Sequence, residues 1–314
     1  MKPRAFKQID VFTSTPYFGN PLAVVLEGSG LDDAAMQRFA HWTHLSETTF
    51  LLPPDDAAAD YQVRIFTPDS ELPFAGHPTL CSCHAWLQAG GKPKRDDFIV
   101  QQCKQGLVKI RREPGSAGTA GMADRLAFAA PPLVRSAPSP VVLAQVTAAL
   151  GLKATQILAA QTLNNGPLWL GLLLDSPETV LQLAPNHIEL GRLQVKVGVA
   201  GIYKHSTSPA LIGRANREAR AFSKTSATDV ASTPDLEVRA FAACIGIAED
   251  PVTGSLNASL AQWLMLEGYM PQQYTASQGV CLGRAGLVYL QRDSAGQVWV
   301  AGESVTCVDG SVML

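Results

Sequence analysis

The sequence predicts an α+β protein made of two related lobes. Two domains are expected for a chain of 314 residues, since a domain usually has about 100–200 residues. Hydrophobic residues make up 46% of the chain and charged residues 17%, which suffices for a large buried core and argues against disorder. A strand, turn and helix pattern in the first half also recurs in the second half. These three observations favour a duplicated unit.

The first ninety residues predict short strands and two helices. Apolar runs and alternating apolar residues favour strands at 6–12, 22–26, 48–52 and from 61 onward. The first helix is expected to start at Asp32, a suitable N-cap, because apolar residues then recur on one helical face. The second helix follows Pro73 and is expected to close at Gly90 and Gly91.

The middle of the chain is rich in turn-forming residues. Glycines at 114–121 and prolines between 130 and 140 predict breaks in regular structure, with a domain boundary near residue 130. A helix from Pro140 to Gly151 and strands near 168–174 and 195–203 are expected beyond it. We therefore predict a first lobe of residues 1–129 and a second lobe of residues 130–296.

The duplicated unit is visible as two pairs of matching segments. Glu71-Leu-Pro-Phe-Ala-Gly76 recurs as Glu249-Asp-Pro-Val-Thr-Gly254, and the preceding Val63–Phe66 recurs as Val238–Phe241. Each copy predicts a strand, a Glu-x-Pro-x-x-Gly turn and a helix. We interpret the two copies as lobes of one fold that face each other across a cleft.

Each repeated turn places a glycine at a predicted helix N-terminus. Four backbone N–H groups lack intrahelical partners there, so such helix ends attract anions. Two of these ends converging from opposite lobes would form a pocket for a carboxylate or for a developing enolate. In this alignment His77 corresponds to Ser255, whereas Asp250 corresponds to the apolar Leu72. The two copies therefore differ in their side chains at the positions where a catalytic site would be expected.

Composition and motifs exclude several classes of function. The net charge of -2 indicates no affinity for nucleic acid or for an anionic membrane. The six cysteines form no zinc-ligand spacing, and no nucleotide-binding glycine motif is present, so no metal and no cofactor are expected. The chain contains no signal-like or membrane-spanning apolar run, which favours the cytoplasm. We assign no role to the basic segment 214–224, since such runs are usually solvated faces.

Five segments carry a resemblance to a known family. The sequence resembles the PhzF family, the phenazine-biosynthesis isomerase-like proteins of the diaminopimelate epimerase fold. The matching segments are Asp10–Val25, Ser46–Phe50, Arg64–Leu80, Glu249–Ser255 and Gln278–Arg284. The resemblance implies that each lobe wraps a mixed or antiparallel sheet around a central helix, near 77–89 and 255–267. It also implies that 297–314 return to the first lobe and that the protein is a homodimer.

The resemblance further implies a cofactor-independent isomerase. Family members of known activity move a proton between ring carbons of a dihydro-hydroxyanthranilate. Glu47 matches the family's acid/base glutamate, His77 its active-site histidine, and Asp250 a second-lobe residue that would hold a substrate amine or hydroxyl. The positions implied for binding a small carboxylate substrate are Ser46, Gly76, Gly254 and Ser255. A carboxylate suits proton transfer if burial raises its pKa towards neutrality.

Two other functions stay open. Related racemases and epimerases of amino or hydroxy acids use one thiol at each helix N-terminus, whereas this chain has His77 and Ser255 there, with Cys81 and Cys83 further along the first helix. A catalytically silent ligand-binding protein of the same fold is the other possibility. The polar residues also have structural alternatives: Glu47 as a surface or capping residue, and the others as helix caps. The physiological substrate does not follow from the sequence.

Overall fold

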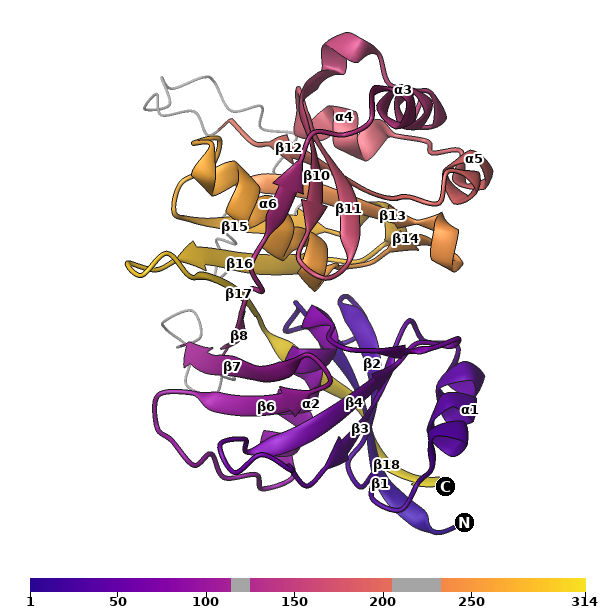
Figure 1. Ribbon diagram of the computed structural model, residues 1–314, viewed down its shortest axis with the longest axis vertical. Helices are drawn as coiled ribbons and strands as arrows, with labels where there is room; N and C mark the ends of the chain where they lie inside the picture. The colour runs from indigo at the N-terminus through magenta and orange to yellow at the C-terminus, as the bar shows by residue number, and fades with distance from the viewer. Residues whose placement is uncertain (114–124, 205–232) are drawn as a thin grey trace, which may run out of the picture.

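The computed structural model describes residues 1–113, 125–204 and 233–314, which form two lobes stacked along the long axis of the molecule (Figure 1). The glycine-rich stretch 114–121 and the basic segment 214–224 lie outside the described residues. Among the helices that are described, none is long and apolar enough to cross a membrane.

The first lobe contains strands on both sides of one central helix. Its elements are β1 (Pro3–Val11), β2 (Asn20–Val25), α1 (Asp33–Thr43), β3 (Thr48–Leu52), β4 (Tyr61–Phe66), β5 (Glu71–Leu72), α2 (Gly76–Gln88), β6 (Ile99–Cys103), β7 (Gly106–Glu113), β8 (Arg125–Ala129) and, from the end of the chain, β18 (Ser304–Met313).

The second lobe has the same plan with more helices on its outer side. Its elements are β9 (Val134–Ser136), α3 (Pro140–Ala149), β10 (Ile157–Asn164), β11 (Leu168–Leu174), α4 (Pro177–Gln182), α5 (His187–Arg192), β12 (Lys196–Ile202), β13 (Leu236–Ala242), β14 (Ile247–Asp250), α6 (Gly254–Leu266), β15 (Gln273–Gln278), β16 (Gly286–Arg292) and β17 (Val298–Gly302).

Strand pairing follows the same order in both lobes. In the first lobe β1 to β4 pair in sequence, and of these pairs only β2–β3 is parallel. Strand β4 also pairs antiparallel with β5 and parallel with β6. Strands β6, β7 and β8 then pair antiparallel in sequence. In the second lobe β10 to β17 repeat this pattern strand for strand. Antiparallel pairing of β8 with β17 joins the two sheets. The predicted α+β fold of two pseudo-symmetric lobes is confirmed.

In each lobe, one edge of the sheet is completed by the strand that comes next in the chain after the last strand of the other lobe. After β17, the chain returns as β18 to pair antiparallel with β1, and after β8 it continues as β9 to pair antiparallel with β10. The expectation that prolines break all regular structure between 130 and 140 is wrong for 134–136. Strand β9 forms there as a three-residue edge strand between the two groups of prolines. The exact division of the chain at 129/130 stays a prediction.

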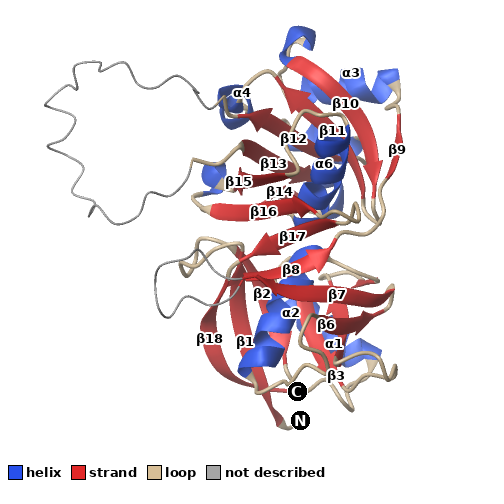
Figure 2. Ribbon diagram, turned by 90° about the vertical axis from the view of Figure 1, so that its left-hand side faces the viewer, coloured by secondary structure: helices blue, strands red, loops and turns tan. Residues whose placement is uncertain are grey.

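The central helices α2 and α6 are enclosed by strands (Figure 2). Both are buried on nearly all sides, as expected for helices without a polar face. Gly90 and Gly268, with φ of 90° and 75°, follow them in the left-handed conformation that ends many helices. The outer helix α1 starts as predicted, since the Asp32 carboxylate accepts a hydrogen bond from the Ala35 N–H at 2.7 Å.

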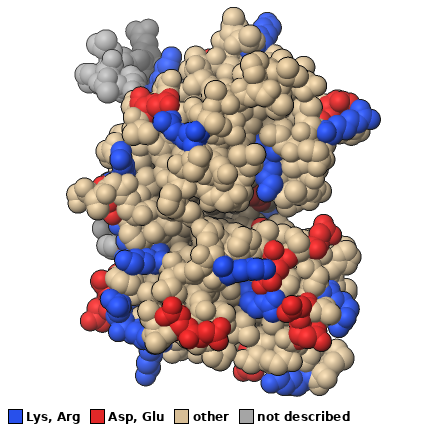
Figure 3. Space-filling model, viewed as in Figure 1, with Lys and Arg blue, Asp and Glu red and all other residues tan. Residues whose placement is uncertain are grey.

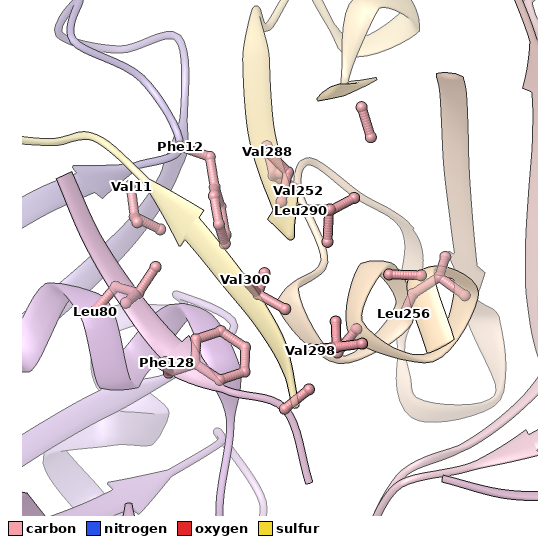
Figure 4. Packing of buried hydrophobic residues seen from close by; sticks show 14 of the residues in the cluster. Val11, Phe12, Leu80, Phe128, Val252, Leu256, Val288, Leu290, Val298 and Val300 are labelled. Atoms are coloured by element: carbon pink, nitrogen blue, oxygen red, sulfur yellow. The ribbon is translucent and has the colours of Figure 1, made fainter. Parts of the chain in front are cut away.

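One hydrophobic core runs through both lobes, and each lobe has a smaller core beneath its outer helices. Figure 4 shows the shared core at the junction, where Val298 and Val300 of β17 lie between Phe128 of the first lobe and Leu256 of the second. These side chains are at most 4% exposed. The junction is therefore a packed apolar interface, which holds the two helix N-termini in a defined relation.

Candidate active site at the junction of two helix N-termini

The first turns of α2 and α6 touch each other across the lobe junction. A Cβ added to Gly76 would lie 3.2 Å from the Gly254 Cα, and one added to Gly254 would lie 3.1 Å from the His77 backbone nitrogen. Both glycines therefore permit an approach that any side chain would obstruct. The two helix ends bring their unpaired N–H groups to one place, which favours negative charge there. On the face shown in Figure 3 the surface is indented where the lobes meet.

Glu47 and His77 form a close contact within the first lobe. Glu47 immediately precedes β3, and His77 is the second residue of α2. The distance from Glu47 Oε2 to His77 Nε2 is 3.5 Å, with side chains only 15% and 6% exposed. Neither atom has a hydrogen-bond partner among the described residues, and the same holds for the buried hydroxyl of Ser46. Three buried polar atoms at this point thus have unused hydrogen-bonding capacity.

Burial sets the protonation of this pair. It lowers the pKa of His77 to about 4, with the Asp250 charge acting in the opposite direction, so the imidazole is neutral at physiological pH. Burial also raises the pKa of the Glu47 carboxyl; the Ser46 hydroxyl, which interacts with it short of hydrogen-bond geometry, and the charge of Lys196 oppose this rise. A carboxyl with a raised pKa beside a neutral imidazole has the properties of a proton-transfer site.

Asp250 enters from the second lobe, at the end of β14. Its carboxylate accepts hydrogen bonds from Thr253 Oγ1 at 2.6 Å and from Asn20 Nδ2 at 3.0 Å. Burial raises the pKa of Asp250 to about 6; His77 lowers it and Glu47 raises it. Asp250 is therefore coupled electrostatically to both first-lobe residues, and the three titratable positions predicted from the sequence lie together.

Ser255 follows Gly254 in the first turn of α6. Its hydroxyl accepts a hydrogen bond from Trp169 Nε1 at 3.3 Å, and its carbonyl accepts one from Asn165 Nδ2 at 3.0 Å. The N-cap residues of α2 and α6 are Ala75 and Thr253, and neither side chain makes a capping hydrogen bond. His77, Asp250 and Ser255 are therefore not helix caps, and Glu47 is not a surface residue.

A polar network that sequence reasoning missed holds the second-lobe turn. Asn20, 1% exposed, donates to Asp250 Oδ1 and to the Val252 carbonyl at 2.8 Å, and so ties β2 to the opposite lobe. Gln278 donates to the Asp250 carbonyl and accepts from the Thr253 N–H, both at 3.0 Å. Both residues lie in segments that match the family, but side-chain type alone did not distinguish them from turn residues.

The cysteines have a different environment from that of a thiol-pair racemase. Cys81 and Cys83 are fully buried, and burial raises both thiol pKa values, that of Cys83 to about 12. A thiol held protonated is a poor base, which weighs against this alternative. In the described part of the chain, no three His, Cys, Asp or Glu side chains are grouped so that they could hold a metal ion.

Two lobes with a sheet around a central helix, and buried titratable groups where the two helix N-termini meet, are typical of the class of epimerase-like isomerases. Residues 9–310 match the family model of phenazine biosynthesis-like proteins, PhzC-PhzF. The chain belongs to this family. It is an isomerase, the class to which its named relatives belong.

Relatives and solved structures agree over the whole chain. It is 30% identical over 317 residues to the trans-2,3-dihydro-3-hydroxyanthranilate isomerase of Pseudomonas aeruginosa, with 98% of each chain covered. It is also 30% identical over 319 residues to Antisense-enhancing sequence 1 of Schizosaccharomyces pombe, with 99% of each covered. A PhzF-family protein of Bacillus anthracis superposes with a TM-score of 0.77 at 20% identity over both full chains. A hydroxyproline epimerase from Agrobacterium vitis shares the fold, with a TM-score of 0.59 at 12% identity over 99% of this chain and 93% of its own.

Proposed function

We propose that the protein is a proton-transferring isomerase in which Glu47 takes a proton from one carbon of a small carboxylate substrate and returns it to another. The observation that carries this proposal is the buried contact between the Glu47 carboxyl and the neutral His77 imidazole, at 3.5 Å. The relatives named as trans-2,3-dihydro-3-hydroxyanthranilate isomerases support a dihydro-hydroxyanthranilate-like substrate.

The other groups have complementary roles in this proposal. Neutral His77 donates or accepts a hydrogen bond at the reacting region, and Asp250 orients a substrate amine or hydroxyl. The N–H groups at the starts of α2 and α6 stabilise the enolate that forms when the C–H proton leaves. Ser46 and Ser255 offer hydroxyls to the bound substrate. The proton remains on Glu47 between the two transfers, so the reaction balances without a redox step.

The test is hydrogen–deuterium exchange at carbon, followed by NMR in heavy water. Wild type and Glu47→Gln are incubated with trans-2,3-dihydro-3-hydroxyanthranilate and with cyclic and acyclic amino and hydroxy acids. We expect wild-type incorporation of deuterium and a loss of about 100- to 10,000-fold in Glu47→Gln, the range of a general acid/base contribution. Unchanged exchange in Glu47→Gln would refute the assignment. Ligand binding without exchange would favour the silent binding protein.

The assembly and location of the enzyme are separate proposals. The homodimer and the cytoplasmic location stay predictions, which light scattering of the purified protein and cell fractionation would test.

A further inference from the structure

The strand registers identify Lys196 as the second-lobe counterpart of Glu47. Thr48 lies opposite Phe66 in the first lobe, and Val197 lies opposite Phe241 in the second. The two phenylalanines correspond in the duplicated segments, so the residues facing them across the sheet correspond as well. The positions immediately before these strand residues are Glu47 and Lys196. A carboxylate in one lobe is thus matched by an ammonium group in the other.

Lys196 is connected to α6 through Trp169, whereas Glu47 contacts α2 directly. Glu47 contacts His77, the second residue of α2, whereas the second residue of α6 is Ser255. Lys196 pairs in register with Trp169 on β11, and its Nζ lies 5.8 Å from the centre of the Trp169 ring. The indole of Trp169 donates in turn to the Ser255 hydroxyl. Lys196 therefore borders the second-lobe side of the candidate site.

The charge of Lys196 acts on the space between the lobes. It lowers the pKa of Glu47, although the two residues belong to different lobes. Within the residues that the structure describes, no carboxylate forms an ion pair with Lys196, whereas Arg64, Arg111, Arg135 and Arg239 all have such partners. The Glu47 carboxyl and the Lys196 ammonium thus interact electrostatically without forming an ion pair, and the Lys196 charge has no carboxylate partner among the described residues.

We propose that Lys196 is a specificity-determining residue that binds the anionic group of the substrate, together with the Ser255 hydroxyl. The substrate then lies across the junction with its carboxylate on the second lobe and its acidic C–H towards Glu47. Unlike groups at equivalent positions suit one orientation of an asymmetric substrate. A racemase that works on both faces of one carbon would instead require a proton-transferring group on each side. The orientation of the C–H rests on the proposed function, whereas the binding of the carboxylate does not.

The test compares a carboxylate with its uncharged counterpart. Affinities of 3-hydroxyanthranilate and of its primary amide are measured by isothermal titration calorimetry at pH 8 for wild type, Lys196→Met and Lys196→Arg. We expect wild type to prefer the carboxylate and Lys196→Met to weaken carboxylate binding by about 10- to 100-fold, with amide binding unchanged, as for a lost hydrogen bond to a charged group. Lys196→Arg should retain most of the preference. Lys92→Met, which removes an exposed first-lobe charge, is the matched control.

Each outcome separates this inference from the proposed function. A carboxylate preference that persists in Lys196→Met, or a wild type that does not prefer or does not bind the carboxylate, overturns the role of Lys196. The proposed function still stands in that case if Glu47-dependent exchange is observed. A preference that depends on Lys196 supports the inference even if no substrate exchanges its proton. Thermal unfolding of each variant shows whether a loss of binding reflects a loss of folding, and Lys196→Gln provides a second neutral variant.

Discussion

The two lobes share a frame but differ in the chemistry they contribute. In each lobe an arginine of the central strand makes a two-point ion pair with the glutamate that begins the repeated turn: Arg64 with Glu71, and Arg239 with Glu249. The first pair is 24% and 20% exposed, the second 6% and 7%. Around this repeated frame, the first lobe has Glu47 and His77 where the second has Lys196 and Ser255. Duplication preserved the support for the helix N-termini and left the residues facing the site free to diverge.

The largest effect is expected from breaking the two ion pairs separately. Arg239→Ala leaves Glu249 buried without its partner and should lower the free energy of unfolding by about 3–5 kcal/mol. Arg64→Ala breaks a more hydrated pair and should therefore cost less than Arg239→Ala. Urea denaturation of both variants measures the difference. Equal losses would show that burial does not distinguish the two lobes, and the double variant Arg239→Met/Glu249→Leu should recover much of the stability.

The contact between the helix ends can be tested at its two glycines. A methyl group at Gly76 would lie 2.7 Å from Phe128 Cζ, and one at Gly254 would meet the backbone of the opposite helix. Each alanine variant should therefore lose about 1–3 kcal/mol of stability by overpacking and also lose activity. Gly310→Ala is the control, since no atom lies within 4 Å of an added Cβ and its φ is ordinary. Wild-type activity in Gly76→Ala and Gly254→Ala would contradict a close-contact site.

A smaller effect is expected from the hydrogen bonds that join the lobes. Asn20→Ala removes two buried bonds, to Asp250 and to the Val252 carbonyl, and should cost about 1–3 kcal/mol. It should also raise the pKa of Asp250 further, because the Asn20 bond favours the ionised form. NMR titration of the Asp250 carboxyl measures this change. Gln37→Ala removes two bonds to carbonyls within the first lobe and should leave the Asp250 titration unaltered.

The last test distinguishes the lobes by the sign of a pH dependence, because the contributions of His77 and Asp250 partly cancel in the wild type. The folded pKa of His77 is about 4, below its usual 6.5, so the unfolded chain binds more protons between these values and stability falls as the pH falls. The folded pKa of Asp250 is about 6, above its usual 3.8, so it adds stability over a similar range as the pH falls. Between pH 6.5 and 4, His77→Gln should therefore flatten the loss of stability and Asp250→Asn should steepen it. Urea midpoints at pH 4.5, 5.5 and 7.5 test this, and parallel curves would contradict both shifts.

The duplication and most early elements could be predicted because their signals are local. Asp32 caps a helix through its own neighbours, and the Glu-x-Pro-x-x-Gly turns recur as short matching segments. The family resemblance added Glu47, His77 and Asp250, and the structure brings these residues together. What they do there remains a proposal.

The correspondence of Glu47 and Lys196 was not predictable from the sequence by the same means. The segment 203–235 between β12 and β13 is much longer than the segment 53–60 between β3 and β4. Glu47 and Lys196 are therefore separated from their matching turns by different numbers of residues. The strand registers, and not the spacing in the sequence, show that the two residues correspond. Asn20 and Gln278 escaped prediction because their partners belong to distant parts of the chain.

The exchange of edge strands has a consequence for biosynthesis. Lys7 of β1 pairs with Asp309 of β18 at 2.6 Å, so β1 has to remain without this partner until a strand 302 residues further along the chain has been synthesised. Until then the open edge of β1 is a template for unwanted pairing with other nascent chains. Such long-range closure also slows folding. Chaperone dependence during translation should therefore concentrate on the lobe that is synthesised first.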